Sequence, residues 1–304
     1  MKAVLSAGLA VPARALAQAA TPGAEDIVIE RPAPTNVRKG QTFVLVTPHL
    51  DDGPIFAGGT VAKLLLEGCD GYFVRTSNDE KDSLDLSPGE TVLANEKDTA
   101  AFVETMGLKR SFDFGYRNHR MDDVGRTEIR GRLIFLFRLL KADIVLSYDP
   151  WSHYEENPDH YVTAQAVEAA CWMAGGRLDM PEHFAAGLQP HAVAEKYYFA
   201  RGPQLVNRVV DIQPVLETKL RAIRSCRTMI AHMIGDLNAD LTRRGRKADA
   251  VPAGDAGIAE YARTVFAERD RRIGRAFGLE FAEQFHYIGP DTAAQDLFTN
   301  RHSK

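Results

Sequence analysis

Short runs of β-branched and apolar residues alternate with helix-forming stretches, and this alternation constrains the fold more than any other feature of the chain. The first run, 42–47 (TFVLVT), lies between Gly40 and Pro48, as a buried strand would. Further strands are predicted at 72–76, 111–114 and 143–148, and helices at 59–67, 93–106 and 127–141. This order predicts an α/β fold: a Rossmann-like, mainly parallel sheet flanked by helices on both faces.

The second half of the chain continues the pattern less regularly. Strands are predicted at 196–200 and 208–212, and helices at 214–237 and 258–277. We find no internal repeat, low-complexity linker or change in composition that would mark a second domain. We therefore expect a single α/β hydrolase domain over 39–304, preceded by a lead over 1–38.

Composition excludes several classes of protein. Hydrophobic residues make up 45% of the chain and charged residues 26%, which is typical of a folded globular domain. The formal net charge of -4 gives no overall attraction to nucleic acid, and the basic stretch 243–247 (RRGRK) is interpreted as a solvated loop. No segment is long and apolar enough to predict a membrane span. The three cysteines suggest neither a disulfide framework nor a zinc finger, so any metal must be held by histidines and carboxylates.

The first twenty residues resemble a secretory signal. They are rich in alanine and leucine, and the small-x-small pattern at 15–17 (ALA) predicts cleavage after Ala17. The single lysine, Pro12 and Arg14 fit such a signal poorly. The pattern slightly favours export to the periplasm or medium over a cytoplasmic location.

A histidine and two carboxylates follow the first predicted strand directly. His49, Asp51 and Asp52 occupy the loop before the next helix, where this fold class places its ligands. The imidazole and one carboxylate can bind a metal ion, and the other carboxylate can remain beside it without binding. This arrangement is typical of a catalytic metal site, which keeps a position open for water.

A second motif follows the strand predicted at 143–148. In the segment 157–160 (NPDH), Asn157 is a suitable N-cap and Pro158 a suitable first helical residue, so His160 would lie in the first helical turn. Because both strands end at the same edge of the sheet, His160 can complete a set of two histidines and one carboxylate. Each motif alone has a plain structural explanation as a turn or a helix cap. Their occurrence together favours a metal site.

With these two motifs in order and in this strand context, the chain resembles the PIG-L (LmbE-like) family of zinc-dependent N-acetylglucosaminyl deacetylases. The resemblance covers roughly residues 40–290 and includes, as weaker points, Lys219 and the segment Glu283–Phe285. It implies that His49, Asp52 and His160 hold Zn²⁺ or another divalent ion, and that Asp51 is the general base. It also implies that the protein hydrolyses an N-acetyl group from an amino sugar or glycoconjugate, since a divalent ion makes water acidic enough for Asp51 to deprotonate it.

Two residues depart from the pattern of the family. Gly53 stands where many members have glutamate, and Asn157 stands where many have a histidine that polarises the substrate carbonyl. Asn157 can donate a hydrogen bond but cannot carry a proton. Stabilisation of the oxyanion would then fall to the metal, to the Asn157 amide or to His153, although an ordinary loop histidine is the simpler interpretation of His153. Asp159 is predicted to orient a ligand or only to place charge at the helix N-terminus.

Two other functions stay open. One is a metal-containing carbohydrate-binding protein that has lost turnover, which Asn157 suggests; the other is a metal-dependent esterase. The retained Asp51 favours an enzyme. The loops at 75–81 and 118–120 could also reach the site, and a homo-oligomer is compatible with the sequence.

Overall fold

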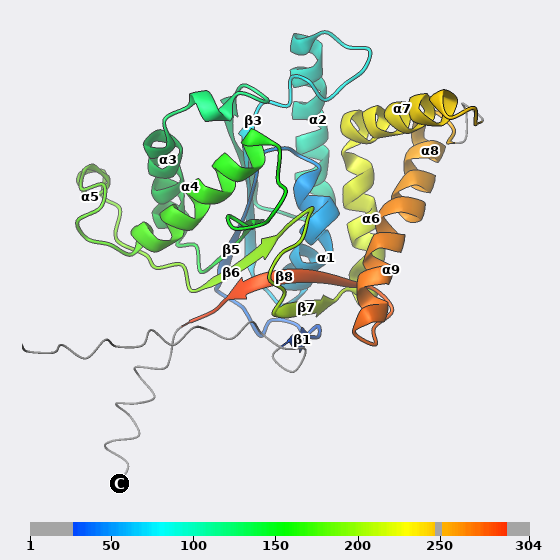
Figure 1. Cartoon of the computed structure of the whole chain (residues 1–304). Helices are drawn as coiled ribbons and strands as arrows, with labels where there is room; N and C mark the ends of the chain where they lie inside the picture. The colour runs from blue at the N-terminus through cyan, green and yellow to red at the C-terminus, as the bar shows by residue number, and fades with distance from the viewer. Residues whose placement is uncertain (1–26, 247–250, 291–304) are drawn as a thin grey trace, which may run out of the picture.

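An eight-stranded sheet forms the centre of the molecule in the computed structural model, which describes residues 27–246 and 251–290 (Figure 1). The strands are β1 (Val28–Glu30), β2 (Thr42–Thr47), β3 (Asp70–Ser77), β4 (Arg110–Tyr116), β5 (Ile144–Tyr148), β6 (Glu195–Phe199), β7 (Arg208–Asp211) and β8 (Ala282–Ile288). Their order in the sheet is β1-β7-β8-β6-β5-β2-β3-β4. All pairings are parallel except the two that β8 makes with β6 and β7. The predicted Rossmann-like α/β fold is confirmed.

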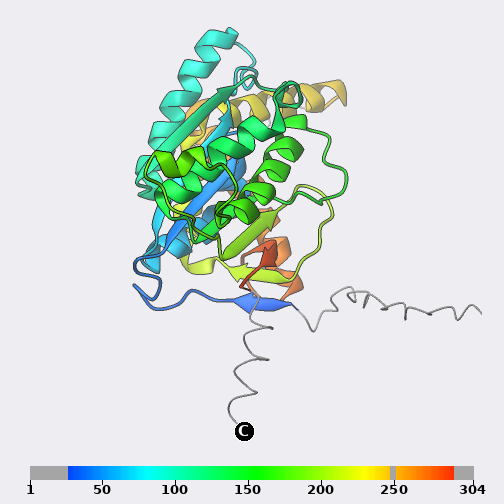
Figure 2. The same ribbon diagram turned by 90° about the vertical axis from the view of Figure 1, so that its left-hand side faces the viewer.

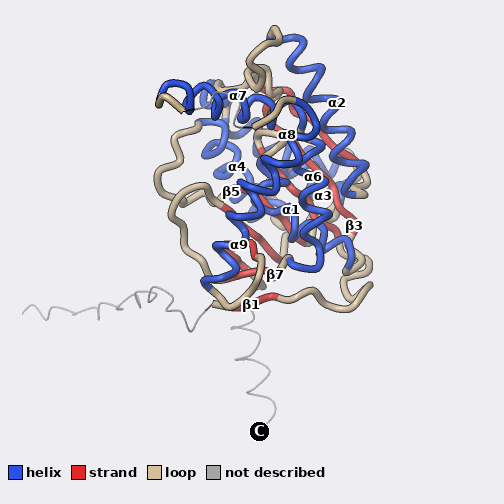
Figure 3. The backbone as a smooth tube through the Cα atoms, turned by 90° about the vertical axis from the view of Figure 1, so that its right-hand side faces the viewer, coloured by secondary structure: helices blue, strands red, loops and turns tan. Residues whose placement is uncertain are grey.

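Helices cover both faces of this sheet. The α-helices are α1 (Asp52–Leu66), α2 (Pro88–Met106), α3 (Arg126–Leu140), α4 (Pro158–Ala174), α5 (Glu182–Ala185), α6 (Leu216–Ser225), α7 (Arg227–Arg243), α8 (Gly254–Tyr261) and α9 (Ala267–Ala276). Figure 2 shows α3 and α4 in front of the sheet, and Figure 3, from the opposite side, shows α1, α6, α8 and α9 in front of it. None of the described helices is long and apolar enough to cross a membrane.

Most of the core consists of two apolar layers, one on each side of the sheet, and a third, small cluster forms around Val209, Leu279 and Ala282. Alternate residues of β2 enter different layers: Phe43 and Leu45 pack toward α1, α2 and α6, whereas Val44 and Val46 pack toward α3 and α4. This follows from the two-residue period of a strand. A strand with both faces buried carries an uninterrupted apolar run, which is why 42–47 is so easily recognised in the sequence.

Local signals place the helices that carry the candidate site. Helix α4 begins as expected, because the Asn157 side chain accepts a hydrogen bond from the Asp159 N–H at 2.9 Å and Pro158 occupies the first turn. Helix α1 begins at Asp52, seven residues earlier than predicted, and Gly68 follows it with φ of 97°. Gly53 allows α1 to approach β2 closely, since an added Cβ would lie 2.6 Å from a Leu45 methyl carbon.

Several expectations need correction. Val28–Glu30, within the predicted lead over 1–38, forms β1 and pairs with β7. The helix predicted over 214–237 is two helices, α6 and α7, which separate at Cys226. The helix predicted over 258–277 begins at Gly254 and contains a π-helical turn at Ala262–Phe266. In the predicted basic loop, Arg243 instead ends α7, and Lys247 lies outside the described residues. The signal-like segment and its predicted cleavage after Ala17 also lie outside them.

Candidate metal centre

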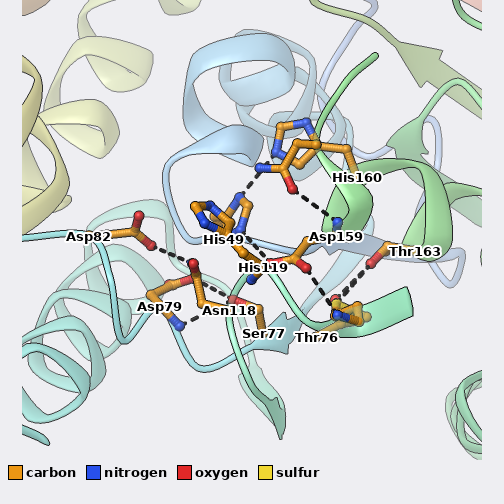
Figure 4. A network of polar contacts seen from close by, with 12 residues as sticks. His49, Thr76, Ser77, Asp79, Asp82, Asn118, His119, Asp159, His160 and Thr163 are labelled. Atoms are coloured by element: carbon orange, nitrogen blue, oxygen red, sulfur yellow. Dashed lines mark hydrogen bonds and ion pairs between the residues drawn. The ribbon is translucent and has the colours of Figure 1, made fainter. Parts of the chain in front are cut away.

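The candidate site lies at the carboxyl ends of four parallel strands, where the loops after β2, β3, β4 and β5 meet. In Figure 4 the His49 ring lies between His160 on one side and the loop with Asp79 and Asp82 on the other. This is the edge at which open α/β sheets bind ligands.

Three possible ligand atoms converge from two of these loops. His49 Nδ1 lies 3.1 Å from His160 Nε2 and 3.3 Å from Asp52 Oδ2, and His160 Nε2 lies 3.7 Å from the same oxygen. Ligands about 2.0–2.2 Å from a tetrahedral zinc ion are about 3.3–3.5 Å from one another. The observed spacing therefore fits a divalent cation without rearrangement of the three side chains, which are all buried.

The remaining nitrogen of each imidazole faces a carboxylate. His49 Nε2 lies 3.1 Å from Asp159 Oδ2, and His160 Nδ1 lies 3.2 Å from Glu155 Oε1. When these nitrogens carry the protons, the lone pairs of His49 Nδ1 and His160 Nε2 point at each other and at the Asp52 carboxylate. Such a cluster of acceptors is repulsive unless a cation lies among them. Histidine ligands commonly donate their second N–H to a carboxylate in this way.

Tyr148, the last residue of β5, holds the Asp52 carboxylate. Its hydroxyl donates to Asp52 Oδ1 at 2.6 Å, and its ring stacks on the His160 ring with centroids 4.2 Å apart. Burial raises the pKa of Asp52, but the facing His160 and His49 outweigh burial and lower this pKa to about 2. Asp52 is therefore anionic at neutral pH, as a ligand of a divalent cation should be.

Asp51 lies beside the three candidate ligands but forms no hydrogen bond with their side chains. It is 4% exposed, and among the described residues none donates a hydrogen bond to its carboxylate. Burial, together with the neighbouring Asp52 carboxylate, raises the pKa of Asp51 well above its usual range. A carboxylate with a raised pKa and no fixed partner is suited to accepting and releasing a proton.

The other predicted catalytic residues occupy different positions. The Asp159 carboxylate is fully buried and also accepts from the His119 N–H at 2.7 Å, so it fixes both the His49 ring and the loop after β4. Asn157 uses its amide oxygen for the cap of α4. His153 is exposed; its N–H donates to the Pro203 carbonyl oxygen, and its ring neighbours Tyr154. None of the contacts found for the described residues joins His153 to the ligand triad.

The loop after β3 contributes two further carboxylates at His49. Asp79 accepts hydrogen bonds from Arg75 Nη1, Ser77 Oγ and the Leu50 N–H, so it supports the loop that carries the ligands. Asp82 accepts from Asn118 Nδ2 at 2.9 Å, and burial raises its pKa to about 7 although His49 partly opposes the rise. The segments 75–81 and 118–120, for which the sequence indicates only that they could reach the site, therefore lie beside it.

Sequence reasoning missed Tyr148 and Glu155. The sequence identifies Tyr148 only as the end of an apolar strand. Glu155 lies outside both motifs, and its spacing from them does not suggest a ligand. One weak signal for Glu155 is its place just before a helix, because negative charge near a helix N-terminus is stabilising. The Glu155 carboxylate faces His160, pairs with Arg201 and accepts from the Asn157 N–H at 3.0 Å. Burial raises the pKa of Glu155, but His160, Arg201 and the Asn157 N–H outweigh burial and lower this pKa to about 2.

Beneath the site, a buried ionic cluster joins α1 to the rest of the fold. Lys219 Nζ lies 2.6 Å from Asp270 Oδ2 and 2.7 Å from Glu283 Oε1, and all three side chains are fully buried. The Glu283 carboxylate accepts from the Gly59 and Thr60 N–H groups of α1. Lys219 and Glu283 are weak elements of the family resemblance. In the structure they fix the position of the helix that begins with Asp52.

The comparisons with known proteins agree with this architecture. Residues 44–171 match the model of the family described as PIG-L, GlcNAc-PI de-N-acetylase. Diacetylchitobiose deacetylase of Thermococcus kodakarensis is 32% identical over 189 residues, which are 59% of this chain and 67% of that protein.

Solved structures share the fold at lower identity. N,N'-diacetylchitobiose deacetylase from Pyrococcus horikoshii, complexed with its inhibitor MPG, has a TM-score of 0.68 at 22% identity, over 84% of this chain and 86% of that chain. GalB, the 4-carboxy-2-hydroxymuconate hydratase of Pseudomonas putida KT2440, has a TM-score of 0.60 at 18% identity, over 82% and 97% of the two chains. On its sequence relatives, its sheet and its paired motifs, the chain belongs to the PIG-L family.

Proposed function

We propose that the protein is a metal-dependent hydrolase that removes an N-acetyl group, or a related N-acyl group, from an amino sugar or sugar conjugate. The observation that carries the proposal is a His49–Asp52–His160 ligand set with the unengaged Asp51 carboxylate beside it. The relative from Thermococcus kodakarensis, of which the chain covers 67%, is named a diacetylchitobiose deacetylase. The fold alone does not choose the reaction, because GalB shares it and is a hydratase.

We assign the cation to His49, Asp52 and His160, and we propose zinc because two imidazoles and one carboxylate are a recurring catalytic zinc set. When bound, a divalent cation supplies Lewis acidity, which makes water acidic near neutral pH and stabilises negative charge on the acyl oxygen. Asp159 and Glu155 keep each imidazole in the tautomer that presents a lone pair to the ion.

Asp51 moves the proton in this mechanism. Its carboxylate takes a proton from the attacking water and then delivers it to the nitrogen of the leaving amine. Burial favours the protonated form that the second step needs, whereas the charge of the bound cation favours the ionised form that the first step needs. Asn157 is proposed to help through its amide N–H₂, since its amide oxygen already caps α4. His153 remains a weaker candidate for stabilising the oxyanion. Its side chain is exposed and could take this role only if its loop moved toward the metal centre.

A binding protein without turnover is the second candidate, and Asn157 is the residue that favours it. The two are distinguished by incubating zinc-loaded protein with N,N'-diacetylchitobiose and N-acetylglucosamine and measuring acetate. We expect acetate release that falls about 10²- to 10⁴-fold in Asp51→Asn. The matched control is Asp70→Asn, an exposed aspartate at the amino end of β3, which should keep full activity.

Metal content is measured in the same preparations. Asp51→Asn should retain one bound ion per chain, because Asp51 is not assigned as a ligand. Acetate release that survives Asp51→Asn would contradict the assigned base. Absence of acetate from both sugars, with zinc fully bound, would favour the binding protein.

A further inference from the structure

Both tryptophans of the chain line one surface cleft outside the candidate metal centre. The cleft has a volume of about 410 Å³ and is bounded by Pro150, Trp151, Gln165, Glu168, Ala169 and Trp172. Trp151 is 54% exposed and Trp172 is 81% exposed, and the sequence contains no other tryptophan. Exposed indoles gathered around a hollow are typical of a binding site, since single exposed apolar residues are common but paired ones are not.

The first indole is held in place by its surroundings. The Trp151 N–H of the backbone donates to Asp149 Oδ1 at 2.9 Å, and the Trp151 ring lies 5.4 Å from the His286 ring and 6.1 Å from the Tyr198 ring, centroid to centroid. A ring fixed in this way loses little conformational freedom when a ligand stacks on it.

Polar groups lie between the two indoles. Residues 165, 168, 169 and 172 share one face of α4, because residues three and four apart on a helix are neighbours. The Glu168 carboxylate is oriented by the Tyr198 hydroxyl and by Lys196 Nζ at 3.3 Å, and a quarter of its side chain remains exposed. Gln165 is partly buried, and no described residue forms a hydrogen bond with its amide.

We propose that this cleft is a saccharide subsite that binds one sugar ring of the substrate. The C–H face of a pyranose stacks on an indole, while the hydroxyls around its edge need donors and acceptors, which the Gln165 amide and the Glu168 carboxylate provide. The choice of a saccharide rests on the proposed function. A second copy of the chain fits less well, because the cores of protein interfaces are depleted in charged residues and Glu168 lies in this cleft.

The subsite is separate from the candidate metal centre but linked to it. Trp151 follows Tyr148 by three residues, and α4 carries both the ligand His160 and the cleft residues. Glu168 is eight residues beyond His160, or about 12 Å along the helix. The ring bound here is therefore not the ring that is deacetylated, and the natural substrate contains more than one sugar.

Tryptophan fluorescence reports on this cleft alone, because the cleft holds every tryptophan of the protein. The full-length zinc-loaded protein is titrated with cellopentaose, a β-1,4-linked glucose pentamer without acetyl groups, and the Asp51→Asn protein with the N-acetylglucosamine pentamer. We expect a saturable change in emission with both probes. Trp172→Ala, read through Trp151, should weaken binding about tenfold or more, and Trp172→Phe should weaken it less.

The matched control is Leu93→Ala, which removes another exposed apolar side chain, 59% exposed, from α2 and should leave both titrations unchanged. Absence of a saturable response, or a response that Trp172→Ala leaves intact, would overturn the proposal. Self-association of the chain that Trp172→Ala abolishes, without a saccharide response, would assign the cleft to a second copy. Acetate release is measured separately. Acetate release without a change in tryptophan emission would refute only the subsite, and a saturable change in emission without acetate release would refute only the hydrolase.

Discussion

We expect two carboxylates outside the candidate ligand set to decide how well its histidines bind a cation. Asp159 and Glu155 each face the second nitrogen of one ligand imidazole, and both lie within or just before the first turn of α4. Because the imidazoles are buried, an incorrect tautomer would place an N–H where the ion needs a lone pair. The short segment 155–160 therefore contains a candidate ligand and both carboxylates that face the imidazoles.

Glu155→Gln tests this argument without changing the shape of the side chain. The amide can accept a hydrogen bond from the His160 N–H but lacks the negative charge that makes the imidazole a better ligand. We expect zinc affinity to fall about 10- to 100-fold, measured by competition with a chromophoric chelator. Glu156→Gln is the control, since the Glu156 side chain is 83% exposed and, among the described residues, its carboxylate pairs with Arg201 alone. Equal affinities of the two variants would show that Glu155 has no orienting role.

The departure at Gly53 has a packing explanation. A Cβ at this position would lie 2.6 Å from Leu45 Cδ2 in the layer between α1 and β2. We expect Gly53→Ala to lower the free energy of unfolding by about 1–3 kcal/mol, measured in urea, because Leu45 must leave its position. Gly89→Ala is the control, since nothing lies within 4 Å of its added Cβ in α2, and it should be neutral or slightly stabilising. A Gly53→Ala protein as stable as the Gly89→Ala protein would contradict this account.

At the residue scale, the sequence predicts those site residues whose position follows from a local motif. His49 and Asp52 are recognisable as candidates because they lie just after a strand, and His160 because it lies in the first turn of a helix behind a clear N-cap. Tyr148 and Glu155 are different, because their roles depend on contacts with Asp52 and His160 that only the folded chain creates. The assignment of Asp51, Asn157, Asp159 and His153 to catalysis stays a prediction.

At the scale of helices and strands, Lys219 connects four elements: α6, α9, β8 and α1. It extends from α6 to Asp270 of α9 and Glu283 of β8, and Glu283 in turn accepts from the backbone of α1. Gly58 leaves room for this side chain, since its Cβ position would lie 3.1 Å from Lys219 Cγ. Helix α1 carries Asp52, so the cluster also sets the position of a proposed ligand.

Lys219→Met removes the cation and leaves two buried carboxylates facing each other. Breaking a buried ionic cluster by removing one partner costs about 3–5 kcal/mol, and we expect a loss of this size in the free energy of unfolding, measured in urea. Lys97→Met, an exposed lysine on α2, should change stability by less than about 0.5 kcal/mol. A Lys219→Met protein within that small range would mean that the carboxylates share a proton and do not need the lysine.

The elements that the sequence missed share a physical cause. The strands β2, β3 and β5 were predicted because burial on both faces gives an apolar run, and their positions are confirmed. Strand β8 (AEQFHYI) mixes polar and apolar residues, and its place between β6 and β7 is fixed by pairing with distant chain. The break at Cys226 has no proline or glycine to mark it.

At the scale of the whole molecule, Glu30 connects the edge strand β1 to the centre of the fold. Its carboxylate accepts from Lys63 of α1 at 2.6 Å, from Arg208 of β7 at 2.9 Å and from the Tyr197 hydroxyl of β6 at 3.0 Å. Burial raises the pKa of Glu30, but Lys63 and Arg208 outweigh burial and hold this pKa below its usual value. The segment before β2 is thereby joined to the sheet by charge as well as by backbone pairing.

This lowered pKa predicts how stability depends on pH. A carboxyl group whose pKa is lower in the folded state than in the unfolded state contributes stability above the unfolded pKa, about 4.5, and loses it as the pH falls through the folded pKa. Glu30→Gln should therefore be less stable than the wild type by about 1–3 kcal/mol at pH 7. The difference should shrink as the pH is lowered below about 4.5.

Urea unfolding of both proteins at pH 7, 5, 4 and 3.5 measures this difference directly. The carboxylates of the candidate metal centre also titrate in this range, but their contribution is common to both proteins and cancels in the difference. Glu104→Gln, an exposed glutamate on α2, should match the wild type at every pH. A gap between wild type and Glu30→Gln that stays constant down to pH 3.5 would mean that the contacts of Glu30 stabilise the fold by hydrogen bonding alone, independent of its charge.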